Sequence, residues 1–241
     1  MNFETLLSRG LIRPAKASPV AGAGFPFGLG ASGLHELAEA AYGDRAAMTG
    51  FLLAAMQPAA RGAWLWVQQG AIGRDSGYVP EAALSASPAR LRLTVRARNT
   101  REALWATEEA IVSGAASMVV AEVEDADFTA TRRLALASGR YGVPVALLLP
   151  YSCSGPTAAS ARWRISPRPS APNRYDPHAP GYPRWRAVLE RCRTAPSVAG
   201  QAFDLEWNDE TLSLGVARGL AAGPPAPHAA PGAPGPRRKA G

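Results

Sequence analysis

Apolar and polar positions follow a strand–loop–helix pattern between Gly33 and Gln57. The segment from Leu34 to Ala38 is short and mainly apolar, as expected for a buried strand. After a polar, glycine-containing stretch, apolar residues recur at helical spacing, namely Ala46, Ala47, Phe51, Leu52, Ala55 and Met56. We therefore predict a strand, a loop and a helix here, and we expect the rest of the chain to be organised around this junction.

The pattern continues as strands alternating with helices up to Pro150. The apolar periodicity predicts strands at 63–68, 90–98, 117–123 and 143–149, and helices that begin at Asn99 or Thr100, end at Gly114, and run again from Thr129 to Tyr141. A loop is expected over 70–79, with a helical turn near Pro80. Such alternation is typical of βαβ units and predicts an α/β fold with a mostly parallel sheet.

The predicted strand at 90–98 carries arginines at alternate positions, which are Arg90, Arg92, Arg96 and Arg98. One interpretation is a phosphate-binding track. The favoured one is an edge strand with a solvated face, because basic side chains on an edge also discourage aggregation.

Beyond Pro150 the pattern changes to alternating strands at 162–165, 185–193, 203–207 and 212–216, with a polar, proline-rich loop over 166–183. This predicts a C-terminal antiparallel extension. We accordingly divide the chain into an N-terminal arm or linker (1–32), a main domain (33–217, with an α/β core at 33–150 and the extension at 151–217), and a basic Pro/Gly/Ala tail (218–241) that is expected to be disordered.

The strand–helix junction is where a phosphate-binding loop would lie. That loop requires G-x-x-x-x-G-K-[ST], since glycines expose backbone N–H groups, lysine reaches the outer phosphates and a hydroxyl holds Mg²⁺. In the matching octet Glu39 and Asp44 replace the glycines, Arg45 replaces the lysine and Ala46 replaces the hydroxyl residue. If Gly43 is taken as the second glycine, Asp44 takes the lysine position and would repel phosphate. The sequence predicts a degenerate phosphate loop, or else an ordinary strand–helix connection.

A second element of nucleotide hydrolases is also incomplete. There, an apolar strand ends in an Asp that holds Mg²⁺, and the corresponding position here is Ala121, with Glu122 beside it. The two cysteines, Cys153 and Cys192, and three histidines do not form a metal-binding or nucleophile pattern. No catalytic residue, metal or cofactor is therefore expected.

Composition adds limits rather than a function. The 241 residues are 47% hydrophobic, enough for a sizeable core, and the formal net charge is +7. The basic excess lies in the two ends and the C-terminal third, which permits a weak or indirect contact with nucleic acid. Neither a long apolar run nor an N-terminal leader pattern is present, so no membrane association is expected, and we predict a cytoplasmic protein.

Several segments, in this order, resemble the ImuA family. They are Gly33-Leu34-His35-Glu36-Leu37, Leu104 to Ala110, Thr131-Arg132-Arg133-Leu134, Arg162-Trp163-Arg164-Ile165 through Pro172, Pro183-Arg184-Trp185-Arg186 and Leu205-Glu206-Trp207. The resemblance covers roughly residues 28–220. It implies a RecA-like P-loop fold and a role in SOS-induced translesion mutagenesis. The implied partners are a polymerase-related ImuB-like protein, an error-prone DNA polymerase and RecA.

Three functions remain open at this stage. The first is a non-catalytic adaptor, for which Trp163, Arg164, Trp185 and Arg186 are the candidate partner-binding residues. The alternative for these residues, which we favour, is that both tryptophans belong to the core and the arginines face water. The second function is cell-division inhibition, as in related SulA-like proteins, and the third is an ATPase with a non-standard loop.

Overall fold

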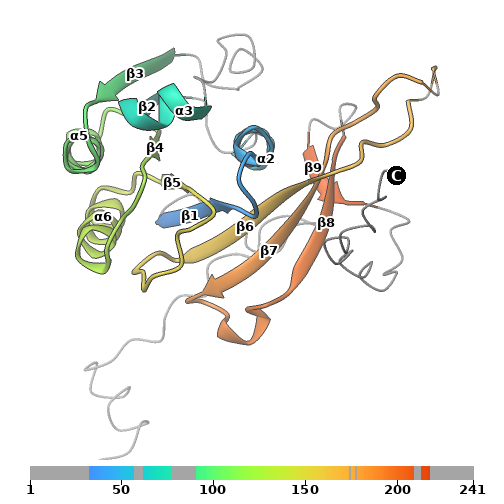
Figure 1. Ribbon diagram of the computed structural model, residues 1–241. Helices are drawn as coiled ribbons and strands as arrows, with labels where there is room; N and C mark the ends of the chain where they lie inside the picture. Colours follow the sequence, from blue (N-terminus) through green and yellow to red (C-terminus); the bar gives the residue numbers. More distant parts are fainter. Residues whose placement is uncertain are drawn as a thin grey trace, which may run out of the picture.

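The computed structural model describes residues 33–56, 62–76, 91–173, 175–176, 178–208 and 213–217, and all structural statements below refer to these residues. They form a mixed α/β structure built on one nine-stranded sheet, ordered β3-β2-β4-β5-β1-β6-β7-β8-β9 (Figure 1). The strands are β1 (Leu34–Glu39), β2 (Ala63–Gln69), β3 (Leu91–Ala97), β4 (Met118–Glu122), β5 (Val145–Leu149), β6 (Ala161–Arg168), β7 (Arg184–Cys192), β8 (Ala202–Asn208) and β9 (Ser213–Val216). The helices are α2 (Arg45–Met56), α3 (Gly70–Ser76), α5 (Thr100–Ser113), α6 (Phe128–Tyr141) and the short 3-10 helix η1 (Pro196–Val198).

The sheet is parallel from β3 to β6 and antiparallel from β6 to β9. At its centre, Leu37 of β1 pairs with Leu148 of β5 on one side and with Trp163 of β6 on the other. Because the carboxyl ends of parallel strands meet at one edge of a sheet, the loops after β1, β4 and β5 lie close together. This edge contains the β1–α2 junction.

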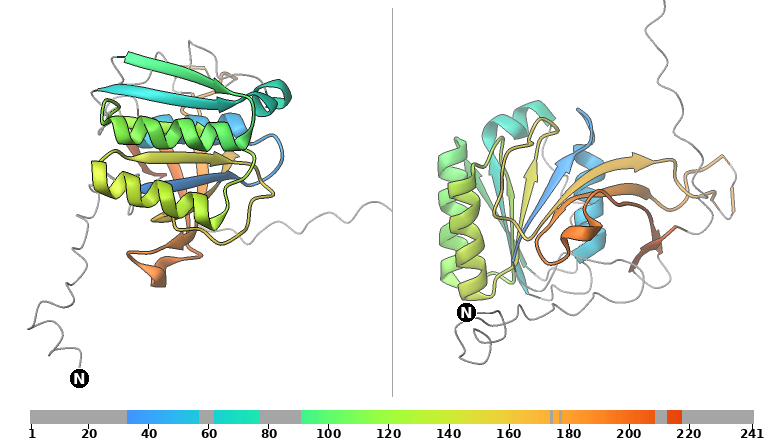
Figure 2. Two further views of the ribbon diagram at one scale, coloured as in Figure 1. Left: turned by 90° about the vertical axis from the view of Figure 1, so that its left-hand side faces the viewer. Right: turned by 90° about the horizontal axis from the view of Figure 1, so that it is seen from below.

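Helices cover both faces of the parallel part of the sheet. Helices α5 and α6 lie side by side over one face, and α2 lies on the opposite face, where the strands from β6 onward curve around it (Figures 1 and 2). Two buried apolar clusters correspond to these layers. One contains Phe51 of α2, Trp66 and Trp163, and the other contains Ile111 of α5, Leu134 of α6 and the alternate residues of the same strands.

Local sequence explains where α5 and α6 begin and end. The side chain of Asn99 accepts a hydrogen bond from Glu102 N at 2.9 Å, and Gly114 ends α5 in the left-handed conformation, with φ 65°. Asp127 caps α6 in the same way through Ala130 N, at 2.7 Å. These contacts satisfy backbone groups that a helix end leaves unpaired. Of the two predicted caps, Asn99 and Thr100, the structure uses Asn99, and the predicted stop at Gly114 is confirmed.

Most predicted elements are present, with two corrections. The expected loop over 70–79 begins instead with helix α3. The antiparallel extension begins with a strand, β6, that pairs in parallel with β1, so the sheet continues across the division that we placed at residue 150. β3 is an edge strand as predicted. The arm at 1–32, the turn near Pro80, Arg90 and the tail at 218–241 lie outside the described residues.

None of the described helices combines the length and the apolar character that a membrane crossing would require.

Candidate functional site

The β1–α2 junction is a short loop between a fully buried strand and a helix. β1 ends at Glu39 and α2 begins at Arg45. The backbone carbonyl of Asp44 accepts from Met48 N at 2.9 Å, which makes Asp44 the residue that caps α2. Gly43 has φ +97°, and a Cβ added to it would meet no atom within 4 Å, so glycine serves the backbone turn rather than a close approach. The predicted strand–loop–helix is thus confirmed.

The loop binds one of its own carboxylates. The Asp44 side chain accepts a hydrogen bond from Ala41 N at 3.0 Å, and Asp44 N donates to Ala41 O at 3.2 Å. In a working phosphate loop, backbone N–H groups of this kind point toward the phosphates. Here the carboxylate of Asp44 takes a position that competes with any added anion.

Arg45 is buried between two carboxylates from the ends of two strands. Its Nε lies 3.3 Å from Glu39 Oε1 in β1, and its Nη1 donates to Glu122 Oε2 in β4 at 3.3 Å. Its side chain is only 10% exposed. The cation at the lysine position of the motif is therefore neutralised within the protein. Ala46, at the hydroxyl position, is exposed and brings no ligand atom.

Glu122 is held by three donors from three residues. Besides Arg45, it accepts from Trp66 Nε1 at 2.5 Å and from Gln68 Nε2 at 2.9 Å, both on β2. Buried charges require such partners, since a carboxylate away from water is otherwise strongly destabilising. Glu39, Arg45 and Glu122, which we call the junction triad, are consequently a packed structural network.

Burial raises the pKa of Glu39 above its usual value. The positive charge of Arg45 and a hydrogen bond from the Tyr151 backbone oppose this rise, whereas the nearby carboxylates of Asp44 and Glu122 reinforce it. The triad has two carboxylates and one guanidinium, so it holds excess negative charge when both acids are ionised. This arrangement disfavours a phosphate at the same position.

The two predicted metal-strand positions, Ala121 and Glu122, have side chains on opposite faces of the sheet. Ala121 packs with the apolar cluster on the α5–α6 side, whereas the side chain of Glu122 lies on the α2 side, beside Arg45. Glu122 is therefore the carboxylate of this pair of positions that lies beside the junction. No group of three His, Cys, Asp or Glu suited to a metal is found among the described residues.

The two candidate tryptophans are core residues. Trp163 is fully buried and Trp185 is 5% exposed. Trp185 packs edge-on against Phe51 of α2, with the ring centroids 6.4 Å apart. Trp163 packs edge-on against Phe203 of β8, with the ring centroids 5.9 Å apart. They join the curved antiparallel strands to α2 and to one another, as in the interpretation that we favoured.

The two candidate arginines differ from each other. Arg164 donates to both oxygens of Glu190, at 2.7 and 3.1 Å, and to backbone carbonyls of Glu39, Tyr151 and Cys153 at 2.7–3.0 Å. It is therefore a structural residue, and our expectation of a water-facing side chain is wrong for it. Arg186 is half-buried on the face of β7 opposite that of the buried Trp185, and it makes no ion pair with the described residues.

Sequence analysis missed a buried ion pair on the opposite side of β1. Arg162 Nε lies 2.6 Å from Glu36 Oε2, and both side chains are at most 2% exposed. Thr157 Oγ1 donates to the other oxygen of Glu36 at 2.5 Å, and Arg162 Nη1 donates to Gly155 O at 2.8 Å. The sequence indication was a charged residue of opposite sign within each of two otherwise apolar strands. This indication could be used only once the pairing of β1 with β6 was known.

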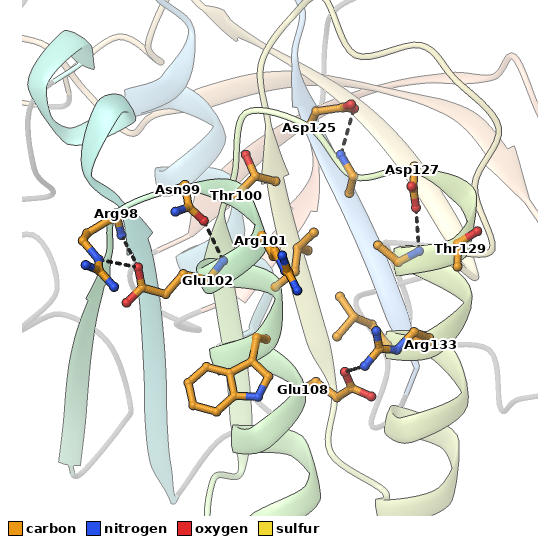
Figure 3. A pocket seen from close by; sticks show the side chains of 15 residues that line it. Arg98, Asn99, Thr100, Arg101, Glu102, Glu108, Asp125, Asp127, Thr129 and Arg133 are labelled. Carbon is orange, nitrogen blue, oxygen red and sulfur yellow. Dashed lines mark hydrogen bonds and ion pairs between the residues drawn. The ribbon is translucent and has the colours of Figure 1, made fainter.

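A groove between α5 and α6, with a volume of about 970 Å³, was also missed (Figure 3). The side chains at its upper end include the two helix caps, and an ion pair between Arg133 and Glu108 crosses it. The sequence indication of this groove was Trp105, which lies outside the apolar stripe of α5. Trp105 is exposed and lines the groove.

The fold and the site define a mixed α/β protein with a strand–loop–helix junction whose charged side chains form ion pairs with one another. Comparison with known proteins identifies it more closely. The chain is 36% identical over 189 residues to Protein ImuA of Caulobacter vibrioides, in strain NA1000 / CB15N and in strain ATCC 19089 / CIP 103742 / CB 15, covering 71% of this chain and 73% of the relative. The chain therefore belongs to the ImuA family, which confirms the resemblance.

Two further comparisons complete this picture. No family model matches the chain. Among solved structures, the crystal structure of SulA from Pseudomonas aeruginosa aligns with a TM-score of 0.40 and 16% identity, over 48% of this chain and 97% of that one.

Proposed function

We propose that this protein is a non-catalytic, RecA-like accessory protein of SOS-induced translesion DNA synthesis. In this proposal it acts as an adaptor between an ImuB-like protein, an error-prone polymerase and RecA. Membership of the ImuA family is the observation that carries the proposal. The β1–α2 junction at the centre of a largely parallel sheet supports a P-loop type of frame.

The geometry of the junction supports the absence of ATP chemistry. A phosphate bound there would have to displace the Asp44 carboxylate from Ala41 N and separate Arg45 from two buried acids. Breaking a buried ion pair costs roughly 3–5 kcal/mol. A nucleotide would have to overcome this cost without the glycines and hydroxyl that a phosphate loop supplies.

Calorimetric titration with Mg-ATP tests this half of the proposal. We expect no saturable binding at micromolar concentrations by the full chain. Binding that is lost in Arg45→Ala, while the variant keeps its far-UV spectrum, would show that the loop works as an ATP site and would favour the ATPase alternative.

The face of β7 and β8 opposite α2 supports the adaptor half. It bears two neighbouring ion pairs. Arg168 Nε lies 3.2 Å from Asp204 Oδ1, and Arg184 Nε lies 2.5 Å from Glu206 Oε2. Arg186 lies beside these pairs, opposite Asp204 in the strand register. Asp204 is engaged by Arg168, which leaves the guanidinium of Arg186 available to an acidic group of a partner. Arginine is among the residue types that most often anchor interfaces.

Capture of a purified ImuB-like protein tests this surface. Arg186→Glu should weaken capture at least tenfold and reduce damage-induced mutation. Arg132→Glu, at an exposed arginine of α6 that forms no ion pair within the described part of the chain, is the matched control and should bind like the parent. If both variants fold and bind equally, the docking surface is not this face.

A further inference from the structure

The outer surface of the α5–α6 layer exposes large apolar side chains. Trp105 and Val112 on α5 are 60% and 41% exposed, and Leu136 on α6 is 65% exposed. Trp105, Glu108 and Val112 follow one another at spacings of three and four, so they share one face of α5. Arg133 of α6 bonds to Glu108, and Leu136 stands one turn after Arg133.

The bond between Arg133 and Glu108 therefore fixes these side chains on one face of the molecule. We call Trp105, Val112 and Leu136 the outer apolar face. These residues are exposed, whereas Ala103, Ala110 and Ile111 of α5 and Leu134 of α6 are buried. The two helices lie next to each other over one face of the sheet (Figure 2). All three side chains are more than two-fifths exposed, and a contiguous exposed apolar patch is characteristic of a docking site.

The described chain begins directly beside this layer. Gly33 N donates to Ser138 Oγ of α6 at 3.0 Å, and Ser138 Oγ donates to Val143 O at 2.6 Å. Residues 1–32 therefore join the described part at the C-terminal half of α6. Any segment within residues 1–32 is therefore tethered next to α6.

The first residues have a composition that suits the outer apolar face. Phe3, Leu6, Leu7 and Leu11 recur at the spacing of one helical face, with Glu4, Ser8 and Arg9 between them. The 20 residues from 13 to 32 can span up to about 66 Å when extended. α6, with 14 residues, is only about 21 Å long. The connecting segment can thus reach the whole face.

We propose that residues 3–12 of the same chain dock on the outer apolar face. In this arrangement the apolar side chains of Phe3, Leu6 and Leu7 cover Trp105 and Leu136. The occupant is the chain's own N-terminal segment because it is tethered next to the face, which gives it a high effective concentration. This surface is distinct from the Arg186 face, and the inference stands without the proposed function.

The test measures how accessible Trp105 is to acrylamide in the full chain. Emission from Trp105 is isolated as the difference between each variant and the same variant with Trp105→Phe. Docking predicts that Leu6→Glu/Leu7→Glu increases quenching of Trp105 at least threefold. Ser8→Glu/Arg9→Glu, with two new acids on the polar side of the segment, is the matched control and should leave quenching unchanged.

Two results would overturn the proposal. Equal quenching in the parent and Leu6→Glu/Leu7→Glu would mean that these residues do not cover Trp105. Shielding in the parent that disappears on dilution from about 100 to about 1 μM would assign the cover to a second copy, because an intramolecular contact does not depend on protein concentration. Shielding that is independent of concentration and lost only in the apolar-side variant supports it.

Discussion

Single residues decide what the β1–α2 junction can do. Arg45 stands where a phosphate loop has its lysine, yet its guanidinium lies between Glu39 and Glu122. The residue types at this junction predict that phosphate chemistry is absent, and titration with Mg-ATP tests that prediction. The sequence alone did not predict the ion pair between Arg45 and Glu122, since the side of the sheet on which Glu122 lies depends on strand register, and a shift of one residue reverses the face.

The raised pKa of Glu39 predicts that removing its charge increases the free energy of unfolding, by an amount that depends on pH. A folded pKa above the unfolded value means that the group favours folding when protonated, and that this contribution is lost as pH rises through the folded pKa. Glu39→Gln should therefore be more stable than the parent at pH 8, by about 1 kcal/mol, because a buried charge is removed while Arg45 keeps Glu122 as its ion-pair partner. The difference should shrink as pH falls toward 4. Urea denaturation at several pH values measures it.

Glu102→Gln is the control for this experiment, because the pKa of Glu102 is shifted in the opposite direction from that of Glu39. Hydrogen bonds from the backbone and side chain of Arg98 lower the pKa of Glu102. Its contribution to stability is present above the unfolded pKa and is lost as pH falls through the folded pKa. Glu102→Gln should thus be the less stable protein at pH 8 and equal to the parent in acid. A Glu39→Gln curve with the same sign as Glu102→Gln would contradict the buried-charge interpretation.

At the scale of elements, local pattern gave the strands and helices but not every neighbour. α5 and α6 were predictable because caps, glycines and apolar spacing lie within a few residues of each other. The parallel pairing of β1 with β6 was not, since it joins residues more than 120 positions apart, as in the contact of Glu36 with Arg162. α3 was missed because a short, glycine-containing segment lacks a periodic pattern.

Arg164 is the residue that connects these distant elements. From β6 it binds the end of β1, the β5–β6 connection and Glu190 of β7. We expect Arg164→Ala to reduce the free energy of unfolding by roughly 2 kcal/mol, because it leaves two part-buried carbonyls and a carboxylate without donors. Arg164→Lys should recover only part of this loss, since an ammonium cannot reproduce the planar fork.

Guanidinium denaturation of these variants measures that loss, with Arg186→Ala as the matched control. Arg186 lies on the neighbouring strand and forms no ion pair with any described residue, so its replacement should change stability by no more than about 0.5 kcal/mol. Equal effects of Arg164→Ala and Arg186→Ala would mean that the contacts of Arg164 do not stabilise the fold.

At the scale of the whole molecule, the division that composition suggests at residue 150 does not divide the sheet. β1 is hydrogen-bonded to β5 on one side and to β6 on the other. One apolar cluster contains α2, the parallel strands and Trp185 of β7. The change of composition after Pro150 reflects exposed faces and connecting loops rather than a separate core.

Residues 33–217 should therefore unfold in a single transition, and the fragment 33–150 should not fold alone. Without β6 and β7, Phe51 loses its contact with Trp185, Glu36 loses Arg162 as its buried partner, and β1 becomes an open edge. Far-UV circular dichroism and calorimetry of the fragment measure this, with deletion of residues 221–241 as the control that should leave the melting temperature unchanged, because Pro/Gly/Ala-rich sequence has little apolar surface to pack. A cooperative melting transition in the isolated 33–150 fragment would mean that the α/β core is independent and that the antiparallel strands are an addition to it.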